Sequence, residues 1–298
     1  MLPPDMNASG SLPEFLANSA DFLTAHEREQ LWDAALVMVD SRGLILRLTA
    51  VFGRRVQSLR ISLQKTGAHF GGEVWEHITH RAQDAVEDTL WHSFSLISFG
   101  LSPNPSAESA SPNHTHRVAT ALSGAASGFI GLPGVLFDIP FTTATILRSI
   151  AEIARDAGED LATEDARRAC LEVLAFGGPG PPDDENEIGY WATRAGMNHF
   201  TISLLIKSAA ARFGLVLSEK LLAQTVPVAG ALAGGALNYA FTSYYQDMAR
   251  VTFCLRTLDR RTGEPLAVRQ YFAVLLKAAR GRRRITRRRT PEPVYLPC

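Results

Sequence analysis

The sequence VATALSGAASGFIGLPGVLFDIPFTTATIL runs from Val118 to Leu147 and carries one charged residue, Asp138, in thirty positions. A second stretch, LLAQTVPVAGALAGGALNYAFTSYYQ from Leu221 to Gln246, has no formal charge at all. Neither stretch shows the period-two alternation of a half-buried strand, so both are predicted to be helical. Both have small residues four positions apart, which lets two helix backbones approach closely. These residues are Gly124, Gly128, Gly230 and Gly234.

The two stretches do not have the pattern of membrane-spanning helices. A helix needs about 20 consecutive apolar residues to cross a bilayer. The segment Gly131–Gly134 divides the first stretch, and Pro227 and Asn238 interrupt the second. Two interpretations therefore stay open: the stretches form buried helices at the centre of a bundle, or they form hairpins that enter one leaflet.

The rest of the chain also has helical periodicity. Thr24 and Glu27 have the spacing of a capping box, in which each side chain bonds the backbone N–H of the other residue. We predict an all-α fold without a sheet: a single multi-helix bundle around the two glycine-rich segments. The predicted helices are 27–39, 44–52, 55–65, 73–99, 118–130, 140–157, 164–176, 188–212, 218–226, 228–258 and 265–279.

Proline- and glycine-rich segments predict loops at about 101–117 and 177–187. The predicted domain covers residues 20–275, after a flexible segment at 1–20 and before an arginine-rich, disordered tail at 276–298.

Three segments carry a resemblance to a known family. They are Gly128–Thr143, Leu147–Ala154 and Val226–Phe241, the last reading VPVAGALAGGALNYAF. They resemble the EcsC family, bacterial proteins whose founding member accompanies an ABC transporter, and the similarity extends over about Leu31 to Tyr271. The resemblance implies a bacterial, helical, membrane-related accessory protein, and it supplies no catalytic residues.

Charge is unevenly distributed along the chain. The sequence has 30 basic and 30 acidic residues, but Lys277–Cys298 alone holds eight basic residues and one acidic residue. A block of one sign is typical of a segment that contacts anionic lipid or nucleic acid, or of a solvated chain end. No aromatic residues interleave with the arginines, so we favour lipid over nucleic acid. The arginines expected at a membrane surface are Arg282, Arg283, Arg284, Arg287, Arg288 and Arg289.

Asp138 is the main candidate for chemistry. It precedes Ile139-Pro140, and proline favours the first turn of a helix, so an N-cap role is the structural interpretation. The functional interpretation is a buried carboxylate held for an ion, a proton or the guanidinium of Arg148, with Thr142 and Thr143 as hydroxyl ligands. Asn238 needs partners if it is buried, and we expect it to bond to the Asp138 helix and fix the register of the two segments.

Other motifs give little support for an enzyme. Glu73, His77, His80 and Asp84 share one helical face, which we expect to face solvent, and we predict no metal and no cofactor. The pair His114 and His116 is expected in a loop. No phosphate-binding loop or nucleophile elbow is present in the sequence.

The sequence therefore predicts a non-enzymatic, cytoplasmic accessory protein at the inner face of the cell membrane. Its expected partners are an anionic membrane surface, a membrane protein such as a transporter, or both. Two alternatives stay open, a hydrolase with a buried Asp138 and Arg148 site, and a protein that binds a lipid or another apolar ligand. The charge pattern does not favour nucleic acid, and the oligomeric state is not predicted.

Overall fold

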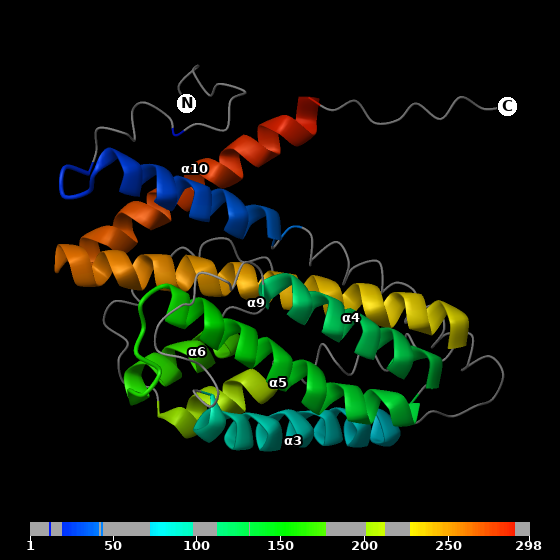
Figure 1. The fold of residues 1–298 in the computed structure, drawn as a ribbon. Helices are drawn as coiled ribbons and strands as arrows, with labels where there is room; N and C mark the ends of the chain where they lie inside the picture. Colours follow the sequence, from blue (N-terminus) through cyan, green and yellow to red (C-terminus); the bar gives the residue numbers. More distant parts are fainter. Residues whose placement is uncertain are drawn as a thin grey trace, which may run out of the picture. The chain divides into compact units, whose positions relative to one another are not determined.

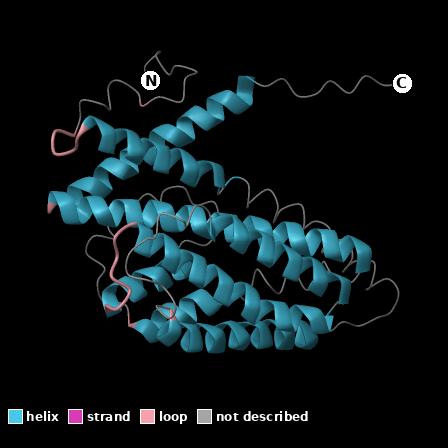
Figure 2. Cartoon of the chain, in the orientation of Figure 1, coloured by secondary structure: helices cyan, strands magenta, loops and turns pink. Residues whose placement is uncertain are grey.

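A computed structural model describes residues 12, 20–41, 43, 72–97, 112–130, 132–176, 201–211 and 227–289 of the 298. Within these ranges the chain is helical apart from short turns, and no strand occurs (Figure 2). The all-α prediction is confirmed. The helices predicted at 44–52, 55–65 and 218–226, and the loop at 177–187, lie outside the described residues.

The chain divides into two compact units. The first contains the N-terminal helix at 25–40, the part of α9 (Pro227–Thr262) from Cys254 onward, and α10 (Pro265–Arg289). The second contains the remaining labelled helices and α9 up to Phe253.

In the second unit, α5 (Leu132–Asp156) is the central helix. It packs against α4 (Pro112–Ile130), α3 (Gly72–Leu96) and α6 (Glu164–Phe176), and it lies between α4 and α3 in Figure 1. Its buried residues include Ile139, Thr142, Ile146, Ile150 and Ala154, which recur every three to four positions.

The α4–α5 hairpin differs from the prediction at both ends. Helix α4 begins at Pro112, so residues 112–117 are helical instead of part of the loop. Helix α5 begins at Leu132, not at 140, because Pro133 occupies its first turn and Pro140 lies inside the helix. Only Gly131 separates the two helices.

The C-terminus of α5 has the hydrogen bonds of a Schellman motif. The N–H of Gly158 donates to Arg155 O, and the N–H of Glu159 donates to Ala154 O. Gly158 has a φ of 82°, a left-handed conformation that costs a glycine little. Helix α5 therefore ends there, and a short turn leads to α6.

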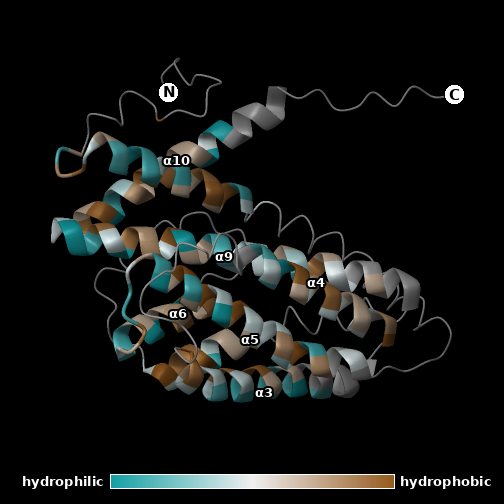
Figure 3. Ribbon diagram, in the orientation of Figure 1, coloured by the Kyte–Doolittle hydropathy of each residue, from teal (hydrophilic) through white to brown (hydrophobic). Residues whose placement is uncertain are grey.

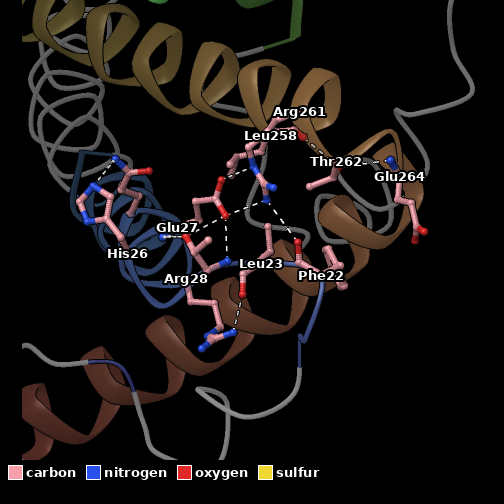
Figure 4. Close-up of polar contacts among 11 residues, drawn as sticks. Phe22, Leu23, His26, Glu27, Arg28, Leu258, Arg261, Thr262 and Glu264 are labelled. Carbon is pink, nitrogen blue, oxygen red and sulfur yellow. Dashed lines mark hydrogen bonds and ion pairs between the residues drawn. The ribbon is translucent and has the colours of Figure 1, made fainter.

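The first unit contains the predicted capping box. Thr24 N–H donates to Glu27 Oε2 at 2.8 Å, and Glu27 N–H donates to Thr24 Oγ1 at 3.3 Å. Arg261, at the end of α9, forms an ion pair with Glu27 and donates to Phe22 O (Figure 4). This cluster attaches the start of the N-terminal helix to the C-terminal end of α9.

Helix α10 continues ten residues beyond the predicted 265–279, as far as Arg289. The arginine-rich segment predicted as a disordered tail from 276 is therefore helical up to that residue. The first turns of α10 are held by buried Val268, Phe272, Leu275 and Leu276, and Arg269 donates to Asp259 at 2.5 Å. The basic segment thus extends a helix that is packed at its start.

Among the described residues, no helix combines the length and hydropathy needed to cross a membrane. Apolar positions of α4 and α5 nevertheless include several that face outward, whereas the outward positions of α3 are largely hydrophilic (Figure 3).

The close approach of α4 and α9 generates a testable prediction. A Cβ added at Gly124 would lie 2.5 Å from Gly234 O and 2.6 Å from Asn238 Nδ2. Because backbone must move to relieve this overlap, we expect Gly124→Ala to lower the free energy of unfolding by about 2 kcal/mol or more. The measurement is urea denaturation followed by circular dichroism.

The matched control is Gly281→Ala in α10, where the added Cβ would meet nothing within 4 Å. This change should raise the free energy of unfolding by about 0.5–1 kcal/mol, because alanine has the higher helix propensity. Equal effects at the two glycines would contradict the close packing of α4 on α9.

Candidate functional site

The Asp138 carboxyl lies at the centre of a buried hydrogen-bonded cluster formed by α4, α5 and α9. Asn238 Nδ2 on α9 donates to both of its oxygens at 3.1 Å. Ser123 Oγ on α4 donates to Oδ1 at 2.5 Å, and Thr142 Oγ1, one turn along α5, donates to Oδ1 at 3.2 Å. Asp138 is 2% exposed and Asn238 is 1% exposed. The predicted bond between Asn238 and the Asp138 helix is confirmed.

Glycines in α4 and α9 make the contact between Asn238 and Asp138 possible, because they have no side chains to hold the two helices apart. The position of Cβ at Gly124 is filled by Gly234 O and by the Asn238 side chain, and the position of Cβ at Gly235 lies 2.9 Å from Ala121 O. Helices α4 and α9 are therefore close enough for the Asn238 amide to reach α5 past α4. The small-residue pattern that predicted close packing thus also positions the amide.

The cluster continues along α4 and α9 away from Asp138. The two hydrogens of Asn238 Nδ2 are shared with two further acceptors, Thr120 O at 2.9 Å and Thr142 Oγ1 at 3.0 Å. The hydroxyls of Thr120 and Thr242 lie 2.8 Å apart, and Arg117 Nε donates to Gln246 Oε1 at 2.6 Å. A line of polar contacts therefore runs between α4 and α9 from Asn238 to Gln246.

The N-cap interpretation of Asp138 is wrong. Asp138 lies six residues after the start of α5, in its second turn, and its partners are side chains from three helices. The sequence suggested a cap because Pro140 was expected to start the helix. Pro133 takes that place, and Pro140 is accommodated inside α5.

The structure does not bring Arg148 to Asp138. The two residues are ten positions apart on α5, about 15 Å along the axis at the usual helical rise. Arg148 Nε instead donates to Glu152 Oε1 at 3.2 Å, as the four-residue spacing predicted. Glu152 is buried, so this pair is not the surface bridge that the spacing suggested.

His116 completes a second polar cluster. It lies on α4, not in a loop as predicted, and its Nε2 is 2.8 Å from Glu152 Oε2. Burial by itself would raise the pKa of Glu152, but the hydrogen bonds and charges of His116 and Arg148 outweigh burial and leave that pKa below its ordinary value. The cluster joins α4 to α5 at Glu152, about four turns along α5 from Asp138.

These contacts favour a structural role for Asp138. Its oxygens receive donors from three side chains of the protein, which leaves the carboxyl poorly placed to act as a general base or to bind a metal. No group of three or more His, Cys, Asp or Glu side chains in the described part of the chain is arranged to hold a metal ion. His77, His80 and Asp84 are exposed on α3, as the sequence predicted.

The other predicted residues have varied positions. Gly128 and Gly230 lie in α4 and α9, and the structure does not describe their surroundings. Thr143 is buried, and its hydroxyl has no partner among the described residues, so it does not join Thr142 at Asp138. Of the six arginines, Arg282 is half-buried, and Arg283–Arg289 are described only as helical backbone.

Sequence reasoning missed Ser123, Thr120 and Thr242. Serine and threonine inside a helix usually bond the preceding turn, so their residue types gave no signal. Their spacing from Gly124 and Asn238 was the available clue, because Thr120 lies one turn before Gly124 and Thr242 lies one turn after Asn238.

A double-mutant cycle tests the Asp138–Asn238 contact. Asp138→Ala and Asn238→Ala should each lower the free energy of unfolding by about 2–3 kcal/mol, because each change leaves a buried polar partner unsatisfied. The double variant should lose at least about 1 kcal/mol less than the two single losses combined. Denaturant unfolding of the four proteins measures the coupling.

The cycle over Asp138 and Arg148, made with Arg148→Ala, is the control. These side chains are too far apart to couple, so their effects should add within about 0.5 kcal/mol. Coupling of Asp138 to Arg148 instead of Asn238 would contradict the described geometry.

The lowered pKa of Glu152 predicts a pH dependence. A carboxyl whose pKa is lower in the folded state than its ordinary value of 4.5 contributes stability that is fully present above pH 4.5 and is lost as pH falls through the folded pKa. We therefore expect Glu152→Gln to be destabilising at pH 7, and the difference from the wild-type protein to shrink below pH 4.5. Urea unfolding across this range measures it.

His116→Gln removes one of the two partners that lower the pKa of Glu152. It should therefore weaken the pH dependence without abolishing it. A difference between the wild-type protein and Glu152→Gln that stays constant down to low pH would contradict the interpretation.

Comparison with known proteins agrees with the resemblance found in the sequence. No curated protein and no solved structure matches the chain significantly. The model of the EcsC protein family matches residues 106–258, just over half of the chain. The match contains α4, α5 and α6, the Asp138 cluster and nearly all of α9, and it covers a narrower range than the similarity extending from Leu31 to Tyr271. The chain belongs to the EcsC protein family.

Proposed function

We propose that this protein is a non-enzymatic accessory protein that acts at the cytoplasmic face of the cell membrane, where its C-terminal helix binds anionic lipid. The observation that carries the proposal is the charge of α10. From Pro265 to Pro291 the chain contains nine basic residues and no acidic residue. Such a segment is attracted to the negative surface potential of a membrane that contains anionic lipids.

The helical form of this segment supports the proposal. Six arginines lie between Arg282 and Arg289, a length of about 11 Å at the usual helical rise. Their charges are therefore concentrated within about one Debye length at physiological salt. Each basic side chain near an anionic surface contributes about 1 kcal/mol of attraction.

The alternative of a hydrolase is not favoured by the geometry. The two residues of the suggested hydrolase site, Asp138 and Arg148, belong to separate clusters. Asp138 accepts hydrogen bonds from Asn238, Ser123 and Thr142. Arg148 donates to Glu152 instead. An accessory role, with a transporter as one partner, agrees with what the family resemblance implies. That partner is part of the proposal.

Vesicle flotation of the full chain tests the proposal. The test variant replaces Arg283, Arg284, Arg287 and Arg288 by glutamine, which has a helix propensity close to that of arginine. At low salt we expect its affinity for phosphatidylcholine vesicles containing phosphatidylglycerol to fall about a hundredfold to a thousandfold, because four attractive charges are lost. Binding by the wild-type protein should fall with salt and with removal of phosphatidylglycerol.

The matched control replaces the same four arginines by lysine, which keeps the charges, and it should bind anionic vesicles nearly as well as the wild-type protein. Unchanged binding by the glutamine variant would contradict the proposal. Tighter binding of a short DNA duplex than of anionic vesicles at the same salt would also contradict it, in favour of nucleic acid.

A further inference from the structure

The end of the α4–α5 hairpin, residues 122–141, which we term the hairpin tip, has an exposed apolar surface. Its five exposed large apolar residues are solvent-accessible to 47–82%, and Phe137 is the most exposed. They are Leu122, Phe129, Ile130, Phe137 and Phe141. A monomeric soluble protein rarely groups so many large apolar side chains at one exposed place, and such patches usually mark a contact with a membrane or a partner.

The contacts between the two helices bring these residues to the same levels of the hairpin. The position of Cβ at Gly134 lies 2.7 Å from Ser127 O, and Asp138 bonds Ser123. Each turn of α5 therefore lies beside a turn of α4. Phe137 is then level with the α4 segment that follows Leu122, and the exposed side chains of both helices are grouped near the hairpin end.

The partly exposed polar side chains of this region form their hydrogen bonds within the hairpin. Between Val118 and Thr145, two of the described polar side chains are partly exposed, and the others are buried. The two are Ser123 and Thr145. Ser123 donates to Asp138, and Thr145 donates to Phe141 O at 2.7 Å. The one charged residue, Asp138, is turned inward to Asn238. The surface therefore offers a partner apolar contact without hydrogen-bonding side chains.

We propose that the hairpin tip inserts into the acyl region of one lipid leaflet. A protein partner would be expected to find hydrogen-bonding groups at about one per 100–200 Å² of interface, and this surface has none to offer among its described side chains. Lipid acyl chains need none. Away from the helix ends, the backbone of α4 and α5 satisfies its own N–H and C=O groups, as a segment in hydrocarbon requires.

The length of the hairpin limits the depth of insertion. The exposed apolar part of α4, from Leu122 to Ile130, is about 12 Å long at the usual helical rise, less than half of the roughly 30 Å hydrocarbon core. The hairpin tip therefore reaches into one leaflet and not across the bilayer. This inference deepens the proposed membrane role, because it adds an apolar contact to the electrostatic contact of α10.

Flotation of the full chain at high salt tests the inference, because salt screens the contact of the arginines with lipid. At high salt, the double variant Phe129→Ser with Phe137→Ser should bind the vesicles at least tenfold more weakly than the wild-type protein does. The control, Leu96→Ser with Leu204→Ser, changes two large apolar residues that are 61% and 46% exposed outside the hairpin, and it should bind as the wild-type protein does. Circular dichroism should show that both variants stay folded.

The outcomes separate this inference from the proposed function. Salt-resistant binding that is absent in the wild-type protein, or equal in the two double variants, would overturn insertion by the tip, while salt-sensitive binding that requires the arginines would still support the proposed function. Salt-resistant binding that persists without the arginines would support insertion alone. Sedimentation that shows a dimer dissociated by the Phe129 and Phe137 changes, without vesicle binding, would overturn insertion in favour of a second copy of the chain.

Discussion

The hydrogen bonds between Asn238 and Asp138 are the contact on which the described core of the second unit depends. A carboxyl group that is 2% exposed is costly to bury without donors, and Asn238 supplies donors to both of its oxygens. The amide reaches Asp138 only because Gly124 and Gly235 have no side chains to separate α4 from α9. The glycines allow the close packing, and the close packing allows the Asp138 carboxyl to be hydrogen-bonded. The three features depend on one another, and together they fix the register of α4, α5 and α9.

This arrangement accounts for the unusual surface of the hairpin. Because the polar groups of α4, α5 and α9 are gathered on their shared inner side, the outer side of the tip carries mainly apolar residues such as Phe129 and Phe137. The basic charge lies elsewhere in the sequence, on α10. The proposed membrane role thus draws on two separate features, an apolar tip and a charged helix.

Sequence patterns predicted the fold class, the bounds of α6, the capping box at Thr24 and the bond from Asn238 to the Asp138 helix. They failed where the same residue type has two structural uses. Proline is favoured in the first turn of a helix, so Pro140 was taken to mark the start of α5, although Pro133 has that role. His116 was placed in a loop because prolines precede it, and the basic end was taken as disordered because charge repulsion usually opposes a helix. The hydroxyl partners of Asp138 depend on packing between distant segments, which periodicity does not reveal.

Cross-linking of α4 to α9 tests the central constraint most directly. The side-chain hydroxyls of Thr120 on α4 and Thr242 on α9 lie 2.8 Å apart, so cysteines at these two positions would bring their sulfur atoms close enough to bond. In a chain whose native cysteines are replaced by alanine, Thr120→Cys with Thr242→Cys should form an intramolecular disulfide on oxidation. The matched pair, Leu122→Cys with Thr242→Cys, should not, because Leu122 is exposed. Equal cross-linking of both pairs, or of neither, would contradict the register that joins Asn238 to Asp138.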